Sequence, residues 1–199
     1  MKQLTAREQG TLQALADAFY EVIPLEFKTY CSFTSAISKA VLDHFAIPAS
    51  IVPCQLWCAT PTDNYVIGFV GNNKTEGKWD GHAICMAGNW LIDTALHHLQ
   101  REFQIPVPPV VVLEAFAIPT QIISRANLSN HHTIWWHTPP QGAHTVPPEN
   151  PPSLVSEYAV ELIAKMTEMS SFRTLPLLGC KGLPKCFNSE SKHETIQNS

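Results

Sequence analysis

The sequence predicts an α+β fold in which a helix packs on an antiparallel sheet. Apolar residues recur at helical spacing across residues 5–23 and again across residues 31–45. Short apolar runs separated by turn residues follow them, at residues 51–59, 64–70 and 82–94. Helices followed by a meander of short strands are typical of α+β proteins, which is the fold class we expect.

Length, composition and charge fit one well-cored domain. The 199 residues are 45% hydrophobic and 15% charged, with a formal net charge of −4. The 13 Lys and Arg residues form no basic run, which argues against nucleic-acid binding. We expect residues 1–178 to form a single domain and residues 179–199 a disordered tail. The low content of charge favours an apolar cleft, a partner or an oligomer.

The first residues lack the apolar core of a signal peptide, and no stretch has the roughly 18 apolar residues of a membrane span. We therefore expect a cytoplasmic protein without membrane contact. Its six cysteines are then expected to be reduced thiols.

Two helices are predicted first. Residues 5–23 carry one apolar stripe and end before Pro24. Residues 31–45 begin with Cys31 and several Ser and Thr residues that can cap a helix, and Ile47-Pro48 ends the pattern.

The strands predicted after them are residues 51–59, with Pro53 at the beginning, an edge or a bulge, and residues 64–70, before an exposed loop at 72–78. Residues 95–103 are predicted to form a short helix, residues 107–116 a segment that ends in a strand, and residues 132–137 the last strand. An extended proline-rich loop is expected at residues 139–152, followed by a helix at residues 153–172 that Ser153 caps.

Residues 81–94 form the most informative stretch, because two apolar runs flank the turn dipeptide Gly88-Asn89. If the turn has two residues, Ala87 pairs with Trp90, and His82 and Asp93 become diagonal neighbours on one face. A four-residue loop places them directly opposite, and a three-residue loop separates them. Two of the three registers let the carboxylate orient the imidazole.

Cys31 is the candidate nucleophile for such a pair. It opens the second predicted helix, where free N–H groups and the helix dipole stabilise a thiolate. The Cys31 thiolate would attack an acyl carbonyl, His82 would shuttle the proton, and Asp93 would fix the imidazole tautomer. The second donor of an oxyanion hole, beside the Cys31 N–H, would come from Gln55 or Trp57 on the next strand. A purely structural role is the alternative for both residues.

This order of residues resembles the transglutaminase-like, papain-like superfamily of cysteine enzymes. Residues 45–52 (FAIPASIV) look like the family's phrase after the nucleophile helix, and residues 90–95 (WLIDTA) look like its strand ending in Asp. Ile84 replaces an aromatic that often follows the family's His. Arylamine N-acetyltransferases are distantly similar through the same Cys, His, Asp order. The resemblance implies acyl transfer from an amide or thioester, by hydrolysis, transamidation or acetyl transfer, without a cofactor, on a protein, peptide or small acyl substrate.

Two other classes of protein stay open. In a non-catalytic binding protein on the same fold, Cys31 is a buried thiol and Asp93 caps the following helix. A metal-binding module would use Cys54, Cys58, Cys85 and the pair His97-His98. In an extended strand Cys54 and Cys58 lie about 13 Å apart, too far to share one ion, so no metal is expected.

Overall fold

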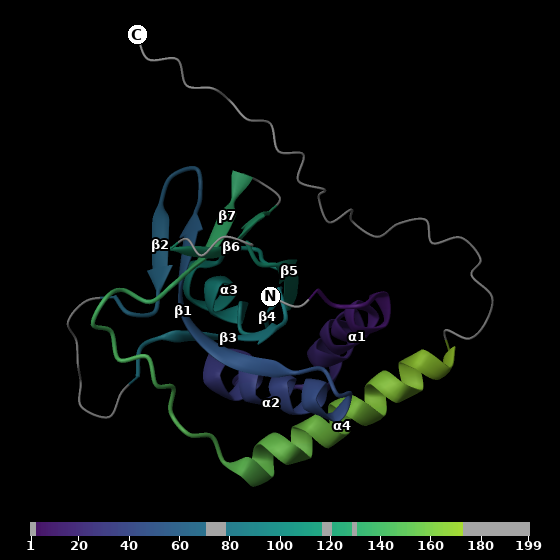
Figure 1. Cartoon of the computed structure of the whole chain (residues 1–199). Helices are drawn as coiled ribbons and strands as arrows, with labels where there is room; N and C mark the ends of the chain where they lie inside the picture. Colours follow the sequence, from purple (N-terminus) through teal and green to yellow (C-terminus); the bar gives the residue numbers. More distant parts are fainter. Residues whose placement is uncertain (1–2, 71–78, 117–120, 129–130, 173–199) are drawn as a thin grey trace.

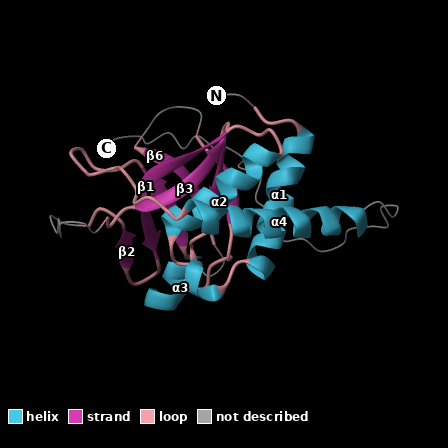
Figure 2. Ribbon diagram, turned by 90° about the horizontal axis from the view of Figure 1, so that it is seen from below, coloured by secondary structure: helices cyan, strands magenta, loops and turns pink. Residues whose placement is uncertain are grey.

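Three helices lie together on one side of a curved antiparallel sheet (Figure 2). The computed structural model of the chain describes residues 3–70, 79–116, 121–128 and 131–172 (Figure 1). The helices are α1 (Ala6–Val22), the 3₁₀ turn η1 (Leu25–Phe27), α2 (Cys31–His44), α3 (His97–Phe103) and α4 (Pro152–Phe172). The strands are β1 (Ala49–Ala59), β2 (Asn64–Ile67), β3 (His82–Ala87), β4 (Trp90–Asp93), β5 (Val111–Glu114), β6 (Ile122–Asn127) and β7 (Thr133–His137). The predicted α+β class is confirmed.

Strand β1 organises the sheet because it changes partners along its length. Its first half, Ala49–Cys54, pairs with β3, and its second half pairs with β7 on one edge and with β2 on the other. Pro53 lies near this change of partner, opposite Ala83, and not at the beginning of the strand. The strand order is β5-β4-β3-β1-β7-β6, with β2 beside β1.

The two ends of the sheet approach each other, so that it is nearly closed. The N–H of Phe116, just after β5, donates to the carbonyl of Ile123 in β6. The Ser124 hydroxyl of β6 also donates to the Glu114 carbonyl, at 2.9 Å. These bonds satisfy backbone groups that would otherwise remain unpaired at the edges.

A hydrophobic core lies on each face of the sheet. On one face α1, α2 and α4 pack around Leu12, Phe19, Ile37 and Leu162, none of which is exposed by more than 2%. On the other face α3 covers an inner core that contains Ile84, Leu91, Leu99 and Trp136. Two cores on opposite faces of one sheet bury both sides of β1 and β3.

Helix α1 ends at Val22 as its sequence pattern predicts, and Thr5 and Glu8 form a capping box at its start. Helix α2 differs from expectation, because its N-cap is Tyr30 and no side chain caps it. The hydroxyls of Thr34 and Ser38 instead donate to carbonyls within the helix. The first turn of α2, which begins with Cys31, is therefore free of a side-chain cap.

Three further predictions are corrected or lie outside the described residues. Helix α4 begins at Pro152, so Ser153 is inside the helix and does not cap it. Strand β6 was not expected, because its sequence IISRAN mixes apolar and polar residues and its pairing with β7 contains a bulge. The predicted loop at 72–78 and tail at 179–199 lie outside the described residues. None of the described helices is long and apolar enough to cross a bilayer.

Candidate active site

The turn between β3 and β4 brings His82 and Asp93 together. Ala87 pairs with Trp90 across a two-residue turn, which is the first of the predicted registers, and Gly88 has a φ of 57° there. Both side chains therefore project from the same face of the hairpin. His82 Nε2 lies 2.7 Å from Asp93 Oδ2, and both residues are completely buried.

The two carboxylate oxygens of Asp93 form hydrogen bonds with three partners. Oδ2 accepts from His82 and also from the indole N–H of Trp136, at 2.7 Å. Oδ1 accepts from the backbone N–H of Ala95, at 3.0 Å. Helix α3 has Leu96 as its N-cap, so Asp93 does not cap that helix. The backbone bond and the imidazole bond use different oxygens, so that one carboxylate makes both.

This pairing shifts the pKa values of both groups. Burial lowers the pKa of His82, but the charge and hydrogen bond of Asp93 and the nearby Cys31 thiol raise it, to a net value of about 10. Burial raises the pKa of Asp93, whereas His82, Trp136 and the Ala95 N–H lower it, with a net decrease. Both shifts mean that the folded protein favours the charged forms, a His82 imidazolium paired with an Asp93 carboxylate.

Cys31 is at the N-terminus of α2, against the beginning of β3. Its thiol is 3.7 Å from the carbonyl oxygen of Gly81, the residue before His82, and the side chain is 8% exposed. Cys31 packs with Ala83 and Ala95, which follow the two polar residues of the pair in the chain. The remaining ring nitrogen, His82 Nδ1, is buried without a hydrogen-bond partner among the described residues. The structure thus brings Cys31, His82 and Asp93 to one place.

Two glycines let backbone pass close to the histidine. Gly68 has a φ of +86°, and a Cβ there would lie 2.6 Å from the backbone nitrogen of His82. A Cβ on Gly81 would lie 2.3 Å from the Trp79 ring. Only glycine therefore fits at position 81 without a movement of that ring. The N–H of Phe69 donates to the Asp80 carbonyl and fastens these two segments together.

Gln55 and Trp57 lie near the site but are engaged with other groups. The Gln55 amide donates to the carbonyls of Gly68 and Phe69, at 2.9 and 3.4 Å, and its oxygen accepts from the Trp57 indole at 2.7 Å. Trp57 is 39% exposed and its ring contacts that of His137. Neither residue presents an unoccupied donor toward Cys31 in this arrangement. Their interactions fasten the Gly68 segment to β1.

The proline-rich segment between β7 and α4 runs past the first turn of α2, which contains Cys31. Its His144 carbonyl accepts from the Trp79 indole at 3.1 Å, and Asn150 lies 3.4 Å from the Ser32 hydroxyl. Residues 139–151 contain no helix or strand, as predicted. This segment therefore forms one side of the surroundings of Cys31, through its contacts with Trp79 and Ser32.

A second thiol, Cys54, lies beneath the site on β1, opposite His82 in the strand pairing. Burial raises the pKa of Cys54, and the charges of Asp93 and Cys31 raise it further. Cys54 and Cys58 belong to the inner hydrophobic core, and Cys85 lies in the core under the helices. The four cysteines of the described residues are all free thiols. Within those residues no three His, Cys, Asp or Glu side chains are grouped for a metal ion.

Two functional contributors escaped sequence reasoning. The sequence predicts a strand at residues 132–137 but gives Trp136 no partner. A fully buried indole needs an acceptor, and that requirement is the available signal. Gly68 could be recognised only through its φ and its contact with β3. Comparison with models of protein families, with curated proteins and with solved structures finds no match to this chain.

Proposed function

We propose that the chain is a cysteine-nucleophile acyl-transfer enzyme, similar in its chemistry to transglutaminase-like proteins. The observation that carries this proposal is a buried imidazole held by a carboxylate, with its other nitrogen unpaired and a helix-terminal thiol beside it. An unpaired buried nitrogen costs free energy in a purely structural histidine. A proton-transfer partner for a thiol requires that same nitrogen to be unoccupied.

The residues would divide the reaction as follows. Cys31 Sγ attacks the acyl carbonyl carbon as a thiolate, with the proton held on the His82 imidazolium, and an S–C bond forms. The amide or thioester bond of the donor then breaks, and His82 returns the proton to the leaving group. Water or an amine next attacks the Cys31 thioester and gives its proton to His82. The S–C bond then breaks, the acyl product leaves, and the Cys31 thiolate is restored beside the His82 imidazolium. Asp93 keeps the imidazole in one orientation and stabilises its cationic form.

The oxyanion of the tetrahedral intermediate needs preorganised donors. The uncapped first turn of α2 supplies backbone N–H groups at Cys31, where the helix dipole also favours negative charge. Gln55 would become the second donor only if substrate displaced one of its two carbonyl partners. The acyl donor would be a peptide, a protein or a small thioester, and reaction with water or an amine would distinguish hydrolysis from transamidation. A reducing cytoplasm would keep the nucleophile as a thiol.

Alkylation and acylation of the purified chain test the proposal. Iodoacetamide labelling is followed against pH, with the site mapped by mass spectrometry, in the natural chain and in His82→Ala. Cys31 is expected to react selectively near neutral pH, and at least about tenfold more slowly in His82→Ala. A small thioester should leave an acyl group on Cys31 and none on Cys31→Ser. Labelling of Cys31 that is slow and indifferent to His82 would instead indicate a binding protein.

A further inference from the structure

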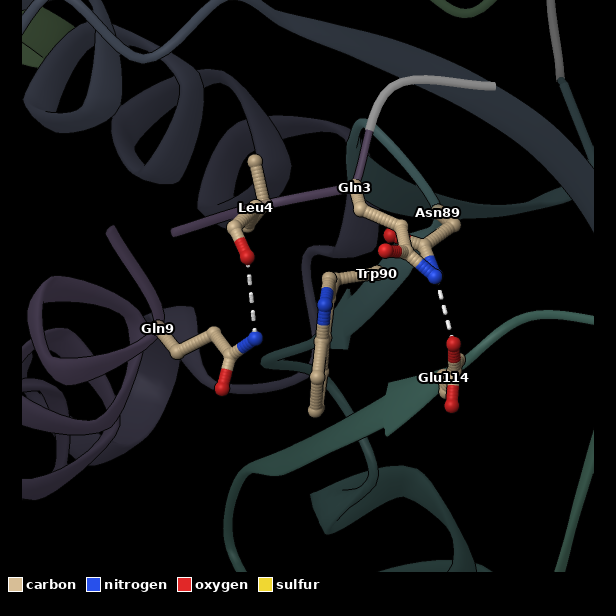
Figure 3. Close-up of a pocket in the computed structure, with 6 residues that line it drawn as sticks. All are labelled: Gln3, Leu4, Gln9, Asn89, Trp90 and Glu114. Carbon is tan, nitrogen blue, oxygen red and sulfur yellow. Dashed lines mark hydrogen bonds between the residues drawn. The ribbon is translucent and has the colours of Figure 1, made fainter. Parts of the chain in front are cut away.

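A second polar site lies at the opposite end of the β3–β4 hairpin from His82 and Asp93. A cavity of about 180 Å³ opens beside the turn, lined by Gln3, Leu4, Gln9, Asn89, Trp90 and Glu114 (Figure 3). The N-terminal segment before α1 supplies one wall, and the Gln9 amide holds it by donating to the Leu4 carbonyl at 3.0 Å. The hairpin and β5 supply the other wall. The cavity takes no part in the proposed acyl transfer, so it stands independently of that function.

Its lining carries negative charge and acceptor groups. Glu114 contributes a carboxylate, and no basic side chain is present among the lining residues. Glu114 forms no ion pair with any residue that the structure describes; its Oε1 accepts one hydrogen bond, from Asn89 Nδ2 at 2.6 Å. That bond fixes the direction of the Asn89 amide. As a result Asn89 Oδ1 is buried without a donor among the described residues, which is unfavourable unless a ligand satisfies it.

The indole of Trp90 completes the site. Trp90 and Glu114 are direct cross-strand partners between β4 and β5, so their side chains are neighbours on one face of the sheet. Figure 3 shows the indole edge-on, with Glu114 on one side of the ring and Gln9 on the other. A cation between the ring and the carboxylate would interact with both, through the negative face of the indole and through opposite charge.

We propose that this cavity binds a primary alkylammonium group, held by Trp90, Glu114 and Asn89 Oδ1. A quaternary ammonium would satisfy the ring and the carboxylate but has no N–H for Asn89. A neutral alcohol could donate to Asn89 but gains nothing from the charge. The volume is below the range of about 300–1,000 Å³ for drug-sized ligands, so the group is small. It is supplied either by a free amine or by a lysine side chain.

Titration of the isotopically labelled full chain with n-butylammonium chloride tests the site, observed at the indole N–H of Trp90 by NMR. We expect a saturable shift with a Kd of about 1–10 mM, weaker at high salt. Glu114→Gln keeps an acceptor for Asn89 and removes the charge, so binding should weaken at least about tenfold. Glu102→Gln is the matched control, because Glu102 is an exposed carboxylate on α3 paired with Arg101, and it should leave binding unchanged.

Two comparisons distinguish the ligand chemistry. n-Pentanol and tetramethylammonium should each bind at least about tenfold more weakly than n-butylammonium. Binding of Nα-acetyl-lysine amide at an affinity similar to the free amine would identify the site as a receptor for lysine side chains, and much weaker binding would identify free amines. Equal binding of n-pentanol, an unchanged affinity in Glu114→Gln, or no saturable shift at Trp90 would overturn the proposal.

Discussion

Gly68 touches the backbone nitrogen of His82, and no other residue could occupy its position without moving that strand. A methyl group at Gly68 would be 2.6 Å from the nitrogen, and the φ of +86° disfavours any L side chain. The position of Gly68 thus constrains the β3 backbone at His82, from which the imidazole projects. The Gln55 amide also holds this segment, by donating to the Gly68 carbonyl at 2.9 Å.

The first prediction concerns this contact. Gly68→Ala should reduce the rate of Cys31 alkylation at neutral pH, because His82 moves, and should lower the free energy of unfolding by about 2 kcal/mol or more. Urea denaturation and labelling kinetics measure the two effects. Gly142→Ala is the matched control, since Gly142 has a φ of +81° but nothing within 4 Å of an added Cβ. If the two variants lost equal amounts of stability and labelling rate, the contact between Gly68 and His82 would not be the cause.

Trp136 provides the second prediction. Trp136→Phe removes the N–H that donates to Asp93 Oδ2 and retains most of the buried apolar surface. A lost hydrogen bond to a buried carboxylate should cost about 1.5–3 kcal/mol of stability and should slow acyl transfer. Trp135→Phe, on the other face of β7, is the control and should preserve the reaction rate. A normal rate in Trp136→Phe would mean that Asp93 orients His82 without help.

Asp93 itself provides the third. In Asp93→Asn the amide cannot stabilise an imidazolium, so the rate of thioester hydrolysis or aminolysis should fall by about 10²–10⁴. The exposed residue Asp63 allows a control, Asp63→Asn, in which the rate should not change. The comparison is made by steady-state kinetics under conditions in which both variants are folded. A retained rate in Asp93→Asn would refute its orienting role.

The dependence of stability on pH is the fourth. The pKa of His82 is raised from 6.5 to about 10 in the folded protein, so folding favours its protonated form. This stabilisation is fully present below pH 6.5 and is lost as the pH rises toward 10. Asp93 has a lowered pKa, and its contribution is present above its unfolded value and is lost as acid protonates it.

Urea denaturation from pH 5 to 10 measures this behaviour. The natural chain should lose stability across the interval above pH 6.5, whereas His82→Gln should show a flatter profile there because it has no imidazole to titrate. Parallel profiles for the two proteins would show that His82 does not carry the effect.

Local patterns in the sequence were sufficient for much of the fold. The stripe of α1, the turn at Gly88-Asn89 and the apolar runs of β3 and β4 depend on neighbours in the chain, and the observed register of the hairpin follows from the turn. The proximity of His82 and Asp93 was therefore predictable. The position of Cys31 against Gly81 needed the packing of α2 on β3, for which the family resemblance supplied the expectation.

What escaped prediction depends on long-range pairing. Strand β6 has little apolar alternation and owes its conformation to β7 and to the bonds across the sheet closure. The hydrogen bonds from the Gln55 amide to the carbonyls of Gly68 and Phe69 depend on where β2 ends. Helix α2 has no side-chain cap, and the hydroxyls of Thr34 and Ser38 donate to carbonyls within the helix. Residue type alone does not reveal which of these two roles a hydroxyl takes.

The exchange of partners along β1 has a consequence for the order of folding. The β3–β4 hairpin joins residues that are close in the chain, so it can form as soon as it leaves the ribosome. Asp93 then has its imidazole but no indole, because Trp136 arrives only when β7 pairs with the second half of β1. We expect the carboxylate to acquire its last donor only after β7 has been synthesised. Until that step the nascent chain contains a formed hairpin in which Asp93 lacks its indole partner.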